Sequence, residues 1–498
     1  MMVLPLGVVG AQAQTAASTT APKAPVTALA APPAAAPLSP TEQWIKDMKN
    51  PAPWLTWGAD LRLRNEYFNN SLNLGDVDTF PGGKRVPHEQ DYFRYRGRVW
   101  TSITPVKDFS LNARLSAEPR EFMETSYPGT YRGRTGMEWR YGIFDNLNFQ
   151  WRNMFDQPLT LTVGRQDIMF GDYWNWFLFA DGTPGDGSWA FFLDAARLTL
   201  DLKDAKTKID AIYIYQNAKP DEWIPTLGRS RGFPASTGYQ LTEQNEQGAV
   251  IYLSNKSIKN TQIDGYFIYK RDNAEFNFGD NANLYTFGAK VSGDLSDHWR
   301  YSAEGAYQFG NKQSVLNAAL APGANRDVSA WAVNSKLIYQ VKDDLKNQFR
   351  MSCEYLTGDD PSTGKNESFD LLWARWPRWS ELYIYSTVPE NGRIAQINNL
   401  IRFGPGWGIT PAKDLDFSVD YFALFSDQKF SNANGLTLPP SGGFGNGSFR
   451  GHYLQAILKY KFSSHVSAHL WSEFVWMGDY YKQRDLMSFL RAEVLFTF

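Results

Sequence analysis

Cysteine and long apolar runs are scarce in this sequence, and each shortage excludes a class of protein. Because Cys353 is the one cysteine among 498 residues, an intrachain disulfide and a cysteine-based metal site are excluded. No stretch of about 18 consecutive apolar residues occurs, so a transmembrane helix is excluded as well. The formal net charge of -2 lacks the basic excess of a nucleic-acid-binding protein.

Aromatic residues are abundant, at 15% of the chain, although the mean hydropathy of -0.43 is that of a hydrophilic protein. A membrane-spanning β-barrel reconciles the two values, because only alternate residues of each strand face lipid. The C-terminal segment LRAEVLFTF shows this alternation, with Leu490, Val494 and Phe496 on one face. Arg491 and Glu493 lie on the other face, as expected for a strand between lipid and a polar lumen.

About eighteen segments with this alternation follow Trp54, and the connections between them alternate between short and long. The short connections are 104–108, 152–158, 202–206, 254–260, 295–298, 341–346, 410–415 and 462–465. The long connections are 69–91, 119–134, 171–194, 217–244, 272–281, 311–326, 358–390, 427–446 and 478–484. The sequence therefore predicts an all-β fold, a single antiparallel up-and-down transmembrane β-barrel of about 18 strands with short periplasmic turns and long outer loops. We expect it in the outer membrane of a Gram-negative bacterium.

The first 53 residues lack this alternation of apolar and polar residues. Residues 1–13 contain a short apolar run and an Ala-Gln-Ala cleavage pattern, and we interpret them as a signal peptide with a truncated start. Residues 14–53 are predicted as a disordered Ala/Pro-rich leader with a short helix, because Ser39 and Pro40 suit an N-cap and a first helical position. Residues 54–498 are predicted to form the barrel.

The polar faces of three neighbouring segments place six arginines in one part of the lumen. We call them the arginine strip: Arg62, Arg64, Arg94, Arg96, Arg98 and Arg114. Three carboxylates share this part of the wall: Asp60, Glu66 and Glu118. Guanidinium groups stay ionised and match carboxylate oxygens, so the strip is predicted to bind anions. The alternative is a lattice of ion pairs that stiffens the wall.

Other charged residues share the polar phase of their strands. They are the arginines Arg197, Arg350 and Arg491 and the counter-charges Asp201, Glu304, Glu354, Glu473 and Glu493. Arg165 has the same phase as Val163, which faces lipid. We expect Gly164 to carry a bulge that turns Arg165 into the lumen, and the alternative is a position near a membrane interface.

Two long outer loops are unusually apolar, at 171–192 and 369–385. Exposed aromatic surface of this size needs cover. Two arrangements are open: the loops fold into the lumen as constrictions, or they lean on lipid and on neighbouring loops.

From Trp54 to the C-terminus the chain resembles the alginate export family of outer-membrane barrels. The resemblance rests on GRQDIMFGD (164–172), WRYSAEGAYQFG (299–310), CEYLTGDD (353–360), FVWMGDYY (474–481) and LRAEVLFTF (490–498). It implies an 18-stranded monomeric barrel whose arginine-rich lumen passes an anionic uronate polymer, and the strip residues and Arg165 are the positions we would match to that role. The chain departs from the family before its penultimate strand, where FSSH (462–465) replaces a long periplasmic connection, so the gating is in question.

The leading hypothesis for function is a channel that passively passes an anionic, alginate-like polysaccharide or related anionic solutes. The alternative is a general or small-anion uptake porin. A structural or adhesive barrel and a membrane hydrolase are less favoured, because only His469 of five histidines has the lumen phase and no G-x-S-x-G or HExxH spacing occurs. We expect no catalytic residue, metal or cofactor. The expected partners are outer-membrane lipid and lipopolysaccharide, the anionic cargo, and periplasmic proteins that deliver it.

Overall fold

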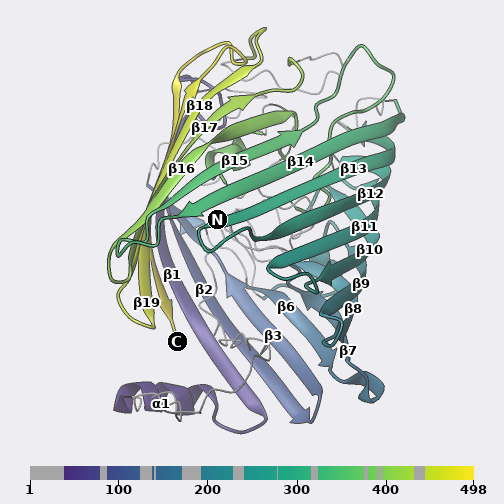
Figure 1. Cartoon of the computed structure of the whole chain (residues 1–498), viewed down its shortest axis with the longest axis vertical. Helices are drawn as coiled ribbons and strands as arrows, with labels where there is room; N and C mark the ends of the chain where they lie inside the picture. The colour runs from purple at the N-terminus through teal and green to yellow at the C-terminus, as the bar shows by residue number, and fades with distance from the viewer. Residues whose placement is uncertain are drawn as a thin grey trace, which may run out of the picture.

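The computed structural model describes residues 39–78, 87–123, 137–138, 142–170, 192–227, 240–276, 279–315, 324–374, 379–387, 390, 393, 396–430 and 443–498. Within these residues, 18 antiparallel strands close into one barrel (Figure 1). The predicted all-β barrel and its strand number are therefore confirmed. Residues 1–38, and with them the predicted signal peptide and most of the leader, lie outside the described residues.

The barrel strands run in chain order around the wall. They are β1 (Leu55–Asn69), β2 (Glu89–Val106), β3 (Phe109–Ala117), β6 (Ile143–Trp151), β7 (Leu159–Gln166), β8 (Leu193–Leu202), β9 (Thr207–Gln216), β10 (Gln244–Asn255), β11 (Thr261–Ala274), β12 (Gly279–Asp294), β13 (Trp299–Val315), β14 (Arg326–Gln340), β15 (Gln348–Leu356), β16 (Leu400–Ala412), β17 (Leu415–Phe425), β18 (Phe449–Lys461), β19 (Val466–Met477) and β20 (Leu486–Thr497). Two short strands, β4 (Arg120–Phe122) and β5 (Met137–Glu138), extend the sheet after β3. Short helices are α1 (Pro40–Lys49), α2 (Leu382–Tyr385) and the 3-10 turns η2 (Met154–Asp156) and η3 (Pro220–Glu222).

The first and last strands close the sheet. β1 pairs with β20 from Asp60 opposite Thr497 to Asn69 opposite Ser488, and it pairs with β2 on its other side. Backbone N–H and C=O groups in lipid need internal partners, and a closed ladder supplies them without a free edge.

The connections alternate as the sequence predicts. Residues 107–108 join β2 to β3 and residues 462–465 join β18 to β19, whereas 357–399 join β15 to β16. The short turns mark the periplasmic rim, and the long loops mark the outer rim. None of the helices within the described ranges is both long and apolar enough to cross a membrane.

Helix α1 lies against the periplasmic rim, at the same end of the molecule as the C-terminus (Figure 1). It begins behind Ser39, whose hydroxyl accepts a hydrogen bond from the Glu42 N–H at 3.2 Å. The indole N–H of Trp57 in β1 donates to the Met48 carbonyl at 2.7 Å, which attaches the end of the helix to the first strand.

Alternation sorts the side chains of each strand between lipid and lumen. Leu61 and Leu63 of β1 are exposed on the outside, whereas Arg62 and Arg64 between them are buried inside. The inner face is not polar throughout. Apolar residues face inward on the outer half of neighbouring strands, among them Ile212, Ile214, Val250, Ile268 and Leu284. This part of the lumen is suited to hold an apolar loop.

Candidate functional site

The arginine strip forms on the inner face of the first strands. The register sets Arg62 of β1 opposite Arg96 of β2, and Arg64 opposite Arg94. Directly opposed residues of neighbouring strands share one face of the sheet, so alternation alone brings these four guanidinium groups together. Like charges at this spacing repel, and the neighbouring carboxylates therefore decide whether the arrangement is stable.

Carboxylates lie between these guanidinium groups. Glu118 accepts hydrogen bonds from Arg62 Nη2 at 3.1 Å and from Arg94 Nη2 at 2.7 Å. Asp60 accepts one from Arg98 Nε at 2.7 Å and one from Arg96 Nη2 at 3.5 Å. Glu118 and Asp60 thus each lie between two arginines that would otherwise repel each other.

Strand β20 joins the same network from the other side of β1. Arg64 Nε donates to Glu493 at 2.6 Å, and Arg491 Nε donates to Glu66 at 2.8 Å. Arg64 Nη1 also donates to Glu66 at 3.2 Å. These side chains are buried, and burial strengthens each charge pair. The ion-pair lattice proposed as the alternative is therefore the arrangement that the structure shows across β20, β1 and β2.

Arg114, the remaining strip residue, belongs to a second network on β3. Its Nε donates to Asp145 at 2.7 Å, and its two Nη atoms donate to the two oxygens of Asp167, each at 2.9 Å. Asp167 directly follows β7, so this fork ties the start of the next outer loop to the lumen wall.

The other predicted lumen charges meet partners on the next strand or on the strand after it. The pairs are Arg197 with Asp210 (2.8 Å), Arg350 with Asp420 (2.9 Å), Glu354 with Arg402 (2.9 Å) and Glu304 with Tyr266 (3.0 Å). Asp201 differs, because it is exposed at the periplasmic end of β8. The sequence located these residues on the inner face, but not their partners.

The structure places Arg165 outside the lumen, at the outer end of β7. The ladders of β7 with β6 and β8 pass Gly164 without a shift in register, so Arg165 stays on the face of its partner Leu147, which is 38% exposed. Its guanidinium binds Asp194 at 2.9 Å and the carbonyl of Pro220, in the loop after β9, at 3.3 Å. The prediction of an inward bulge and a pore-lining Arg165 is wrong, and a position near the membrane interface describes this residue.

A long outer loop enters the lumen. We call residues 357–399 the β15–β16 loop, and the structure describes 357–374, 379–387, 390, 393 and 396–399 of it. Its apolar first arm, with Phe369, Leu371, Leu372 and Trp373, is buried inside the barrel. Of the two arrangements left open from the sequence, insertion is therefore the one that holds for this loop. The other apolar loop, at 171–192, lies outside the described residues except for its last position.

Polar contacts fix the first arm of the β15–β16 loop to one wall. Lys312 of β13 donates to the carboxylate of Asp370 at 2.7 Å. Gln308 and Asp370 exchange two hydrogen bonds through the Asp370 backbone, at 2.9 and 3.2 Å. Lys270 of β11 donates to the Leu372 carbonyl at 3.2 Å.

The tip of the same loop binds the opposite wall. Glu473 of β19 accepts hydrogen bonds from Ser380 Oγ at 2.7 Å and from the backbone N–H groups of Glu381 and Leu382 at 2.8 and 3.1 Å. Arg491 of β20 donates to the Glu381 carboxylate at 2.8 Å. β11 and β20 are nine strands apart in a closed sheet of 18, so the loop bridges the full width of the lumen.

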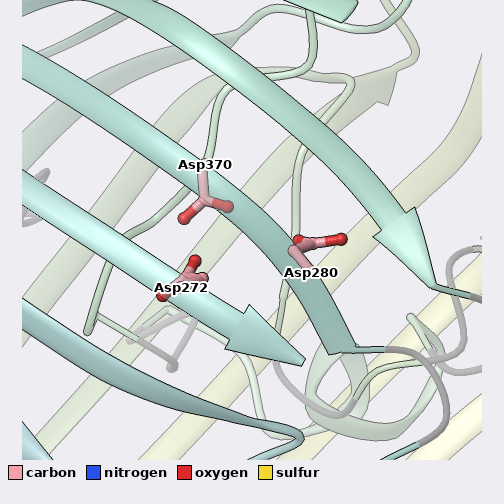
Figure 2. Close-up of side chains that lie close together, drawn as sticks. All are labelled: Asp272, Asp280 and Asp370. Atoms are coloured by element: carbon pink, nitrogen blue, oxygen red, sulfur yellow. The ribbon is translucent and has the colours of Figure 1, made fainter. Parts of the chain in front are cut away.

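Three aspartates converge where the first arm meets the wall, as Figure 2 shows: Asp272 of β11, Asp280 of β12 and Asp370 of the loop. Each offers an oxygen within 4.8 Å of the others, an oxygen set that a divalent cation can use. However, Lys270 lies 3.0 Å from Asp272, and Lys312 lies 2.8 Å from Asp280. Burial acts to raise the pKa of Asp370, but the two ammonium groups outweigh it and hold this pKa below its usual range. The cluster thus acts as an ion-paired anchor for the loop.

Arg450 is a lumen residue that was not predicted from the sequence. The register of β17 with β18 shifts between Leu424 and Phe425, and Gly451 has a φ of 144°, so a bulge turns Arg450 inward. Its Nη1 and Nη2 donate to the two carboxylate oxygens of Glu390 in the β15–β16 loop, at 2.8 and 2.6 Å. A fork of this kind is the strongest form of carboxylate recognition by a side chain.

Replacing Glu473 by Gln is expected to release the loop tip and to raise the single-channel conductance in a planar bilayer. The carboxylate holds Ser380, Glu381 and Leu382, and a neutral amide in its place weakens each hydrogen bond by about 1 kcal/mol. Asp360→Asn is the matched control, because that carboxylate bonds to Ser362 within the same loop. Equal conductance of wild type and Glu473→Gln would show that the tip does not restrict the passage.

Solved barrels from Pseudomonas aeruginosa are similar to this chain. OpdQ aligns with a TM-score of 0.49 at 11% identity over 89% of this chain and 98% of that chain, and OccK8 (OprE) gives the same four values. OccK5 (OpdH) aligns with a TM-score of 0.46 at 12% identity over 89% of this chain and 97% of that chain. No curated protein sequence matches.

A sequence family described as "Alginate export" matches residues 236–493, more than half of the chain. The match begins after the arginine strip and Arg165, so the strip rests on its own geometry rather than on the family. With its closed barrel, the protein is an outer-membrane channel, and the chain belongs to the alginate export family.

Proposed function

We propose that the barrel is an anion-preferring channel whose cargo is an acidic polysaccharide. The observation that carries this proposal is the binding of carboxylates by guanidinium groups inside the lumen. Arg450 holds Glu390 with two hydrogen bonds, and Arg491 holds Glu381 at 2.8 Å. A uronate carboxylate is the same chemical group as a glutamate side chain, so these arginines offer it a matching partner.

The charge balance of the adjoining wall supports the same cargo. On the inner faces of β1, β2 and β20, six arginines are accompanied by four carboxylates, Glu118 directly after β3 included: Arg62, Arg64, Arg94, Arg96, Arg98 and Arg491 against Asp60, Glu66, Glu493 and Glu118. A wall with this balance raises the local concentration of anions, most strongly at low ionic strength.

The β15–β16 loop decides how large the cargo is. While the loop stays bound to Lys270 of β11 and Arg491 of β20 on opposite walls, the lumen is divided. This observation favours a second candidate, a porin for small carboxylate-bearing solutes. Passage of a polymer requires release of the tip that contains Ser380 and Glu381 from β19 and β20.

Block by an added polymer tests the cargo. A polyuronate is expected to reduce the ionic current through wild-type channels more than a neutral polysaccharide of equal length, because its carboxylates bind the lumen arginines. Equal block by both polymers would contradict an acidic cargo. Anion selectivity without block by either polymer would establish the small-solute porin instead.

Replacing Arg94, Arg96 and Arg98 together by Gln is expected to abolish or reverse the anion preference. The barrel should still fold, but Asp60 and Glu118 would then lack most of their positive neighbours. The reversal potential under a salt gradient measures the change. Arg300→Gln is the control, because that side chain is 57% exposed at the periplasmic rim beside Asp294. Unchanged selectivity of the triple variant would remove the arginine strip as its source.

A further inference from the structure

A cavity of about 390 Å³ lies on the periplasmic side of the β15–β16 loop tip. Its wall comes from the inner faces of β14 to β19, and its roof includes Trp379 of the loop. Lys346 and Thr410 line it near the periplasmic turns, so a solute that enters from the periplasm reaches the cavity before it reaches the loop. This volume is in the range of about 300–1,000 Å³ found for small-molecule sites.

One side of the cavity is aromatic. Trp379, Phe422 and Trp471 line it, and the rings of Trp379 and Phe422 meet edge to face at 6.0 Å between centroids. The Arg402 guanidinium lies 4.9 Å from the Trp379 ring and 4.3 Å from the Phe422 ring. Gln455 donates to the Trp379 carbonyl at 2.7 Å and fixes this residue against the wall. Aromatic faces of this kind pack against the C–H faces of a sugar ring.

Arg350, which lines the other side of the cavity, has a buried hydrogen-bond donor without an acceptor among the described residues. Arg350 binds Asp420 through Nε at 3.2 Å and Nη2 at 2.9 Å, while its Nη1 is buried and has no hydrogen-bond partner among the described residues. The Trp379 indole N–H is also buried and has no hydrogen-bond partner among the described residues. Leaving a buried donor unsatisfied costs about 1–3 kcal/mol, so two of them on residues that line one cavity point to a ligand that supplies oxygen atoms.

We propose that this cavity is a binding subsite for a single carboxylate-bearing sugar residue, a hexuronate, which rests on the proposed function of the channel. Arg350 binds the carboxylate, Trp379 donates to a ring or hydroxyl oxygen, and the aromatic side holds the sugar ring. A neutral sugar satisfies only the aromatic side, and a small carboxylate such as acetate satisfies only Arg350. Because Trp379 belongs to the β15–β16 loop, the bound sugar directly contacts the element that divides the lumen.

Isothermal titration calorimetry of the detergent-solubilised full chain tests the subsite, with glucuronate, glucose and acetate as probes. Wild type should bind glucuronate at least tenfold more tightly than glucose or acetate. The double variant Arg350→Gln/Asp420→Asn removes the guanidinium without stranding its partner and should weaken glucuronate binding at least tenfold. Arg300→Gln, outside the cavity, should bind as wild type does.

Trp379→Ala provides a second variant, because it lies on the loop rather than on a strand and therefore spares the barrel ladder. It should weaken glucuronate and glucose alike, whereas the double variant should weaken glucuronate alone. Glucuronate affinity that survives in both variants, or no detectable binding by wild type, would overturn the subsite. Failure of the proposed function is seen separately, as a wild-type channel without anion preference in a planar bilayer.

Discussion

Closure of the sheet between β1 and β20 is the constraint on which the rest of the structure depends. Backbone groups in lipid need hydrogen-bond partners, and a closed ladder provides them without an exposed edge. Once the wall is closed, every side chain of a strand faces either lipid or lumen, so the charges of the strands collect inside. Buried like charges are stable only among counter-charges, which is why Glu118 lies between Arg62 and Arg94 and Glu66 lies beside Arg491.

The lumen holds the β15–β16 loop by two kinds of interaction. Leu371, Leu372 and Trp373 of the first arm are at most 1% exposed, and full burial of such a side chain contributes about 1.5–3 kcal/mol each. The tip, where Leu382, Tyr383 and Ile384 are also buried, and the loop after it add ion pairs, Glu381 with Arg491 and Glu390 with Arg450. A soluble anion cannot replace apolar burial, but it can replace a carboxylate. An opening that cargo drives is therefore expected to begin at the ion pairs of Glu381 and Glu390 rather than at the apolar first arm.

Strand number, turn positions and the inward face of most charged residues could be predicted from the sequence, because a two-residue period and a hydrophobic phase are local properties. The insertion of the β15–β16 loop into the lumen and the partner of each arginine could not be predicted, since both depend on strands far apart in the chain. Arg165 and Arg450 show the limit most clearly. Each adjoins a glycine of positive φ. At Arg450 the register of the ladder shifts, and the side chain turns inward. At Arg165 the ladder continues without a shift, and the loop after β9 binds the side chain outside the lumen. Only the three-dimensional arrangement distinguishes the two.

Anion preference created by lumen arginines is the central claim, and the reversal potential of single wild-type channels under a potassium chloride gradient tests it most directly. The structure predicts a potential whose sign corresponds to chloride as the more permeant ion, with a magnitude that falls as ionic strength rises and screening shortens the reach of the charges. A potential near zero, or one of the sign set by potassium, would contradict it, because the carboxylates of the lumen would then neutralise or outweigh the arginines.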